Sequence, residues 1–145
     1  MTYKWAIGGS FLRGAVRATL RLPSTSSGKL LSCRATVINA KGRTFSQSKA
    51  VRVRFLAAPV ARTRPALVTV PKVGGLVKVT KGRWSLTPFA YRYRFLVNGR
   101  QVALVSRNSL AMYSGWRGRT LVVEVRAYVR GHAVGKALTR PAVIR

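Results

Sequence analysis

Apolar and polar residues alternate one by one along much of this chain. The alternation is clearest in four runs: LVKV from Leu76, YRYRFLV from Tyr91, TLVVEVRAYV from Thr120 and AVRVRF from Ala50. Because successive side chains of a β-strand point to opposite faces, these runs predict strands with one apolar and one polar face. Glycine turns separate the runs, and no segment has a convincing helical period. The pattern predicts an all-β protein built as an antiparallel β-sandwich.

One strand motif occurs twice, ninety positions apart. YKWAIGG begins at Tyr3 and YRFLVNG at Tyr93, and the similarity continues at this offset without a gap, so that Gly28 aligns with Gly118. A period of this length is that of a whole domain and exceeds the period of solenoid repeats. We interpret it as an internal duplication, which predicts two tandem units of similar fold.

The repeat and the local composition predict the domain boundaries. Residues 1–56 form the first unit and residues 65–145 form the second. The residues between them, 57–64, are rich in Pro, Ala and Arg, which is typical of a short, stiff linker. The chain is therefore expected to contain two small domains joined by a spacer.

The second unit resembles the bacterial immunoglobulin-like repeats of actinobacterial surface proteins and their phages. The resemblance extends from about Pro65 to the end of the chain, and from Tyr3 to about Arg54 in the first unit. It implies immunoglobulin-like sandwiches, but such modules serve as spacers, adhesive tips and decorations, so it leaves the function open. The usual repeats carry acidic residues near their glycine turns, whereas TSSG and GWRG stand here, which argues against an ordinary spacer. The matching residues are Gly82 and Trp84 after the second strand, Tyr93, Phe95 and Gly99 on the third, and Gly118 before the penultimate strand.

The first unit is predicted to lack its first two strands. About 28 residues lie between Pro65 and Tyr93, whereas only Met1 and Thr2 precede Tyr3. A sandwich without these strands would expose an apolar face and unpaired strand edges, which native proteins avoid. Three explanations are open: the chain is a fragment, its remaining strands suffice in another arrangement, or a neighbouring chain adds a strand. We favour the neighbouring chain.

Charge separates this chain from ordinary sandwich domains. It has 28 Lys and Arg residues against one acid, Glu124, which gives a formal net charge of +27. Such a chain repels itself and gains free energy from any polyanion. The basic residues are interspersed with regular apolar positions, which argues against a disordered basic tail.

The cysteine content and the N-terminal segment bear on the compartment. Cys33 is the single cysteine, so no internal disulfide forms, and a small buried apolar residue is the expected role. The weakly polar run AIGGSFL is too short for a signal-peptide core, and no run approaches the roughly 20 apolar residues of a membrane span. We expect assembly in the cytoplasm.

The inventory of reactive side chains argues against an enzyme. Acid-base catalysis needs a tuned carboxylate or histidine with a partner, and the chain offers only Glu124 and His132. Glu124 shares a strand face with Arg126, so a charge pair is the expected role, and His132 follows a turn glycine. These residues and Cys33 lack the number and spacing of a metal site. We expect no catalytic residue, no cofactor and no metal.

The candidate binding residues are the basic side chains that face outward. The pattern places some of them on strand faces and others at turns, where they can contact an anionic partner. In the first unit they are strand-borne: Lys4, Arg34, Arg52 and Arg54. In the second unit the strand-borne residues are Lys78, Arg92, Arg94 and Arg126, and the turn residues are Lys81, Arg83, Arg100, Arg117 and Arg119.

Three kinds of anionic partner are considered. Nucleic acid would bind in a salt-sensitive, sequence-independent way, but the chain shows no helix-turn-helix or RNA-recognition motif. An anionic cell envelope suits secreted immunoglobulin-like modules, which would place the protein at the cell surface, but no signal sequence is evident. An acidic capsid or tail protein requires neither a signal peptide nor disulfides. We therefore expect a phage decoration or cement component, located in the virion after assembly in the host cytoplasm.

Overall fold

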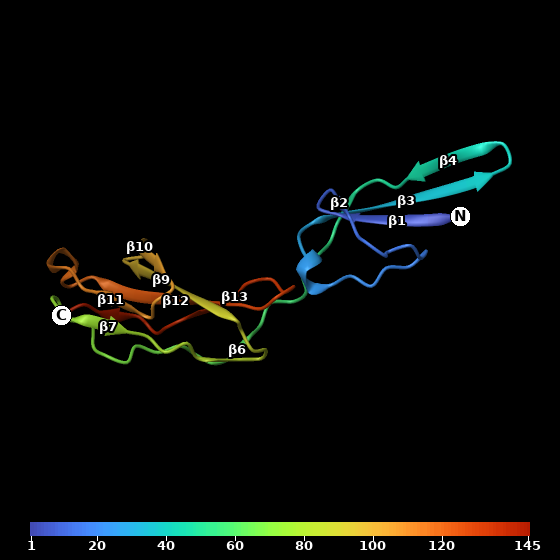
Figure 1. Ribbon diagram of the computed structural model, residues 1–145. Coiled ribbons are helices and arrows are strands. Elements are labelled where there is room, and N and C mark those ends of the chain that lie inside the picture. The colour runs from blue at the N-terminus through green and yellow to red at the C-terminus, as the bar shows by residue number, and fades with distance from the viewer. The chain divides into compact units, whose positions relative to one another are not determined.

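The computed structural model describes all 145 residues and divides the chain into two compact units, Met1–Leu56 and Ala57–Arg145 (Figure 1). Nearly all regular elements are antiparallel strands, and the exceptions are two short 3-10 helices, η1 (Ser24–Ser26) and η2 (Ser114–Trp116). Neither helix approaches the length and apolar character needed to cross a membrane. The all-β class predicted from the alternating pattern is confirmed.

The larger sheet of the second unit contains the runs predicted from Tyr91 and Thr120. A two-residue turn joins its first hairpin, and Asn98 (φ 48°) and Gly99 (φ 77°) both have the positive φ that this turn requires. The sheet has the order β10 (Arg100–Val105), β9 (Ala90–Val97), β12 (Thr120–Tyr128) and β13 (Gly135–Leu138), and β14 (Ala142–Val143) also pairs with β12.

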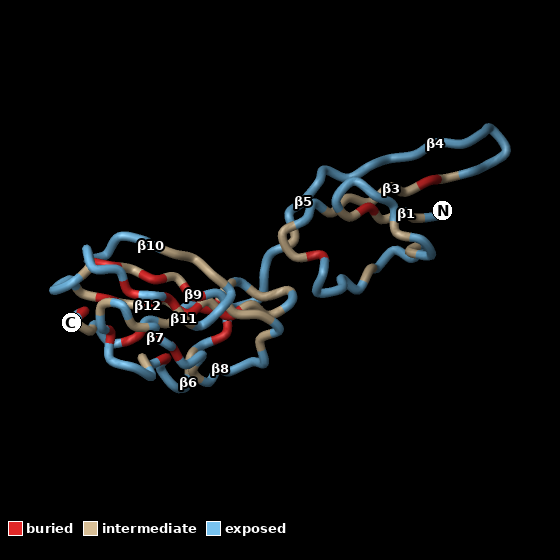
Figure 2. The backbone as a smooth tube through the Cα atoms, turned by 60° about the vertical axis from the view of Figure 1, so that its left-hand side comes forward, coloured by how far each residue is buried: buried red, intermediate tan, exposed pale blue.

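A smaller sheet forms the second layer of this unit. Its strands are β7 (Leu76–Lys78) and β11 (Ser109–Ala111), and a bridge between Leu67 and Val79 adds a third segment. The core between the layers contains Val77 and Val79 from one side and Phe95 from the other, all at most 1% exposed (Figure 2). This arrangement of two antiparallel layers is an immunoglobulin-like β-sandwich.

The segment 57–64, expected to be a short, stiff linker, is paired and packed within the second unit. It contains β6 (Ala61–Thr63), which pairs with β8 (Arg83–Trp84), and Pro59 is buried. Gly135 permits this packing, because a Cβ at that position would lie 2.5 Å from the carbonyl oxygen of Pro59. The composition typical of a linker here belongs to a packed part of the second unit.

The first unit contains one sheet. Each of its elements has a counterpart in the second unit about ninety residues later in the chain. The helices η1 and η2 correspond residue for residue at this offset. Among its residues only Ala6, Ser26 and Thr36 are buried, and Figure 2 shows this unit mostly in the colours of exposed and intermediate residues. The sheet has the order β2 (Ser10–Phe11), β1 (Thr2–Ile7), β3 (Leu30–Asn39) and β4 (Gly42–Gln47), and β5 (Val51–Arg52) also pairs with β3. The first unit therefore has a single sheet and few buried residues.

Candidate functional site

Most of the predicted binding residues are exposed. Three of them are half-buried, Arg34, Arg94 and Arg126, and each of these lies at the centre of a sheet on β3, β9 or β12. The others present their charges to solvent, where an anionic partner can reach them. The exposed residues are Lys4, Arg52, Arg54, Lys78, Lys81, Arg83, Arg92, Arg100, Arg117 and Arg119.

Three basic residues lie side by side across the larger sheet of the second unit. Arg126 on β12 is directly opposite Arg92 on β9 and, on its other side, opposite Lys136 on β13. We call these three residues the basic row. Like charges at directly opposed positions destabilise a sheet, and the carboxylate of Glu124 offsets this cost only in part, at Arg126. An anion bound across the row would remove that cost.

Sequence reasoning missed Lys136. The run GKAL is too short to show its alternation, and the register of β13 against β12 decides which residue faces Arg126. The signal that could have found it is the β12 alternation itself, because any antiparallel neighbour must place one residue opposite Arg126.

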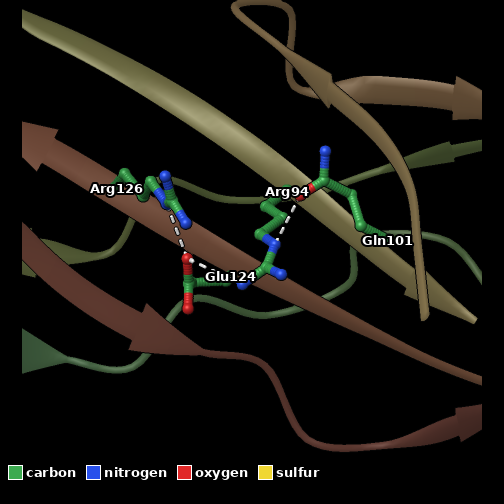
Figure 3. A network of polar contacts seen from close by, with 4 residues as sticks. All are labelled: Arg94, Gln101, Glu124 and Arg126. Carbon is green, nitrogen blue, oxygen red and sulfur yellow. Dashed lines mark hydrogen bonds and ion pairs between the residues drawn. The ribbon is translucent and has the colours of Figure 1, made fainter. Parts of the chain in front are cut away.

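The single acid of the chain is engaged beside the basic row. The Arg126 Nε–H donates a hydrogen bond of 2.6 Å to Oε1 of Glu124, and Arg94 Nη1 lies 3.9 Å from the same oxygen (Figure 3). The hydrogen bond to Glu124 raises the pKa of Arg126. Arg94 also donates through Nε to Oε1 of Gln101, at 2.7 Å. Glu124 is thus used internally, and it leaves Arg92 and Lys136 without an acidic partner.

A shallow depression of about 500 Å³ adjoins the basic row. Arg64 and Lys136 contribute positive charges to its wall, and Glu124 contributes the only negative one. The rest of the lining is apolar: Val60, Ala61, Ala137 and Leu138. The depression therefore combines an apolar lining with two cations and one carboxylate.

The corresponding face of the first unit has no acid. Arg34 donates hydrogen bonds to Oε1 of Gln47, at 3.1 Å from Nη2 and 3.3 Å from Nε. Its guanidinium lies over the rings of Phe11 and Phe45, with Cζ 5.3 and 4.7 Å from their centroids. Contacts of this kind between a cation and an aromatic ring are favourable. The two phenylalanines are 52% and 60% exposed, so this face combines positive charge with accessible aromatic surface.

Some predicted residues lie in elements other than those expected. Arg83 begins β8 and Arg100 begins β10, so both are at strand ends and not in turns. Arg54 follows the end of β5 and is not in a strand. Arg52 is held by a 2.6 Å hydrogen bond from its Nη1 to the carbonyl oxygen of Gly28. The remaining turn residues Lys81, Arg117 and Arg119 lie outside the strands, as predicted.

The other reactive side chains are not brought together. Nδ1 of His132 lies 2.7 Å from the carbonyl oxygen of Ala57, and Cys33 lies on β3 opposite Trp5. No group of three His, Cys, Asp or Glu side chains forms in the structure. What the surface offers chemically is a set of cations on rigid strands.

Comparison with solved structures finds a distant structural similarity. No protein-family model and no curated protein matches the sequence. A solved structure of fibronectin(III)-like modules of Clostridium thermocellum CbhA is similar to this chain, with 14% sequence identity and a TM-score of 0.41. The match covers 99% of this chain and 77% of that one. The immunoglobulin-like assignment of the second unit rests on the strand pairing and the burial described above.

Proposed function

We propose that the protein is a non-enzymatic structural module that attaches to the acidic surface of another protein. The specific assignment that we propose is a decoration or cement component of a phage particle, bound to a capsid or tail protein. In this proposal the chain comprises two tandem immunoglobulin-like copies, the first of which lacks its first two strands. It assembles in the host cytoplasm and becomes part of the virion.

The observation that carries the proposal is the basic row. Arg92, Arg126 and Lys136 are held opposite one another on rigid strands, and the single acid nearby is shared between Arg126 and Arg94. An anionic surface that binds here relieves the repulsion within the row, so the row would destabilise the free protein but favour the complex. The apolar residues that line the depression beside the row favour a protein surface over a bare polyphosphate.

A second contribution comes from the first unit. Its single sheet leaves strand edges and an apolar face that a neighbouring chain can complete. Backbone pairing and apolar burial are not screened by salt, so such a contact would hold the protein in place under conditions that weaken its charge contacts.

Sequence-independent binding of nucleic acid is the alternative that the charge also supports. The exposed rings of Phe11 and Phe45 beside Arg34 favour it, because aromatic and guanidinium planes can stack on bases. Attachment to an anionic cell envelope would use the same cations. These alternatives differ from the main proposal in their salt dependence, since phosphate contacts weaken steeply as salt rises.

The test is sedimentation of nuclease-treated phage particles from a native lysate at about 0.5 M salt, where the screening length is about 4 Å. We expect this chain to sediment with the particles. Release of the chain into the supernatant, or binding only while nucleic acid is present, would contradict the virion assignment. Sedimentation of the chain with cell-wall fragments would instead support the envelope alternative.

A further inference from the structure

The first unit has an apolar face that is less covered than the equivalent face of the second unit, which is buried in the core. The face consists of alternate residues of two neighbouring strands, and we call it the open face. In the second unit, the residues ninety positions later are Tyr93, Phe95, Val97, Leu121, Val123, Val125 and Ala127, and all of these are between 0 and 6% exposed. The open face consists of Tyr3, Trp5 and Ile7 on β1, and Leu31, Cys33, Ala35 and Val37 on β3. None of these residues is buried.

The second unit shows what is missing over the open face. There, β7 pairs with β11, and Val77 and Val79 lie against the counterpart face at 1% and 0% exposure. In the first unit the residues equivalent to β11 are 19–21, which form no strand and make no backbone hydrogen bond. Leu20 is only half-buried, whereas its counterpart Leu110 is 9% exposed. Residues 19–21 thus present an unpaired edge where β11 has a partner.

The unpaired edge is held near the open face. The indole N–H of Trp5, an open-face residue, donates a 2.9 Å hydrogen bond to the carbonyl oxygen of Arg17. The Leu12 amide also donates to the carbonyl oxygen of Trp5, at 2.8 Å. These contacts fix the chain on both sides of the turn at Gly14 and restrain the segment that leads into residues 19–21. Ordering this edge would therefore cost less conformational entropy than ordering a free loop.

The charges around the edge determine which partner fits. Arg17 and Arg21 flank residues 19–20, Arg13 precedes them, and the first unit contains no acidic residue. A second copy of this chain would bring a further +27 to the contact, so charge opposes self-association. An acidic segment is complementary to these arginines.

We propose that the open face binds an extended segment of an acidic partner protein, which pairs with residues 19–21 as an antiparallel β-strand. One face of that segment is apolar and packs on Trp5 and Cys33, as Val77 of β7 shares a buried core with Phe95 and Val123 in the second unit. Its other face carries carboxylates near Arg17 and Arg21. This inference rests on the proposed function in that it names the partner chemistry of the attachment, but it is tested separately from the virion.

Cys33 provides the readout, because it is the only cysteine and lies on the open face. The full chain at low micromolar concentration is labelled with a maleimide, alone and with synthetic nine-residue peptides. The first peptide alternates Val and Asp, the second has the same composition with all Val residues first, and the third alternates Val and Lys. We expect Cys33 to react in the free chain and the Val-Asp alternating peptide to slow labelling at least tenfold. We expect the other two peptides to leave the rate unchanged.

Two neighbouring substitutions on opposite faces of β3 provide a matched control. Val37 lies on the open face and Ile38 on the opposite face, where it is 68% exposed. Val37→Asn should abolish the protection of Cys33 by the Val-Asp alternating peptide, and Ile38→Asn should retain it. Circular dichroism of both variants verifies that the sheet is intact.

Several results would overturn the proposal. These are no slowing by the Val-Asp alternating peptide, equal slowing by the Val-Lys peptide, or equal slowing by an oligonucleotide of the same charge. Protection of Cys33 that rises with the concentration of the chain alone would identify a second copy as the occupant instead. Peptide protection without sedimentation in particles would support strand addition while rejecting the virion assignment, so the two failures are distinguishable.

Discussion

Arg34 occupies in the sheet of the first unit the position that Glu124 occupies in the larger sheet of the second, ninety residues later. In the second unit the carboxylate lies between Arg94 and Arg126 and partly neutralises them. In the first unit Arg34 faces Lys4 across the strands, and only the neutral Gln47 and two phenylalanine rings contact its guanidinium. The two sheets therefore share a backbone plan but differ in how their outer charges are compensated.

Glu124→Gln should destabilise the second unit. The substitution keeps the shape of the side chain but removes the only negative charge near Arg94, Arg126 and the basic row. Since the carboxylate is only 13% exposed, we expect a loss of about 1–2 kcal/mol in the free energy of unfolding at low salt. Urea denaturation, monitored by tryptophan fluorescence, measures this loss in the free energy of unfolding. The loss should shrink at 0.5 M salt, and equal stability of variant and parent at low salt would contradict the role given to Glu124.

Removing one charge of the basic row should stabilise the protein and weaken its binding. Arg92→Gln relieves the repulsion with Arg126, so we expect a gain of up to about 0.5 kcal/mol in stability. Binding of the chain to poly-glutamate, a model of an acidic protein surface, should weaken several-fold. Arg43→Gln, on β4 of the first unit and outside the predicted binding residues, is the control that should change both quantities less. A variant that binds as well as the parent would show that the row is only a solvated surface.

The sequence predicted where the strands lie better than it predicted how they pair with one another. Alternation located β9 and β12 because their inward residues Phe95 and Val123 must be apolar in a packed core. It could not find Lys136, because strand register depends on hydrogen bonds between distant segments. Composition also suggested a linker at 57–64. A proline-rich segment has the same composition whether it is a spacer between domains or is packed against a sheet. Burial of Pro59 depends on Gly135, which is far away in the sequence.

Gly135→Ala should therefore destabilise the second unit. A Cβ at this position would meet the Pro59 carbonyl oxygen at 2.5 Å and the Trp84 ring at 2.9 Å, so the segment containing β6 would have to move. Overpacking of this kind costs about 1–3 kcal/mol. Gly115→Ala is the matched control, because nothing lies within 4 Å of its added Cβ. Thermal unfolding should separate the two variants, and equal melting temperatures would mean that residues 57–64 are not packed in solution.

Alkaline pH should destabilise the second unit through Tyr93. Burial, followed by the nearby Tyr91, raises the pKa of the Tyr93 phenol above its usual value of 10.0. The folded state then favours the neutral phenol, so this contribution to stability is complete below pH 10 and is lost as the pH rises through the folded-state pKa. Tyr93→Phe should flatten the fall in stability above pH 10 relative to the parent, whereas Tyr3→Phe, on the open face, serves as the control. A parallel pH dependence of parent and Tyr93→Phe would exclude this group.

The same substitution at equivalent positions should have different costs in the two units. Val123 is fully buried, so Val123→Ser leaves a cavity and a buried hydroxyl, and we expect a loss of about 3 kcal/mol. Cys33 is half-exposed on the open face, so Cys33→Ser should cost less than about 1 kcal/mol in the isolated chain. Chemical denaturation, with Trp5 reporting on the first unit and Trp84 and Trp116 on the second, measures both losses. If a partner strand covers the open face as proposed, Cys33 should become buried as Val123 is, and Cys33→Ser should then weaken the complex while leaving the free chain stable. A large loss of stability for Cys33→Ser in the free chain would instead mean that the face is already covered in solution.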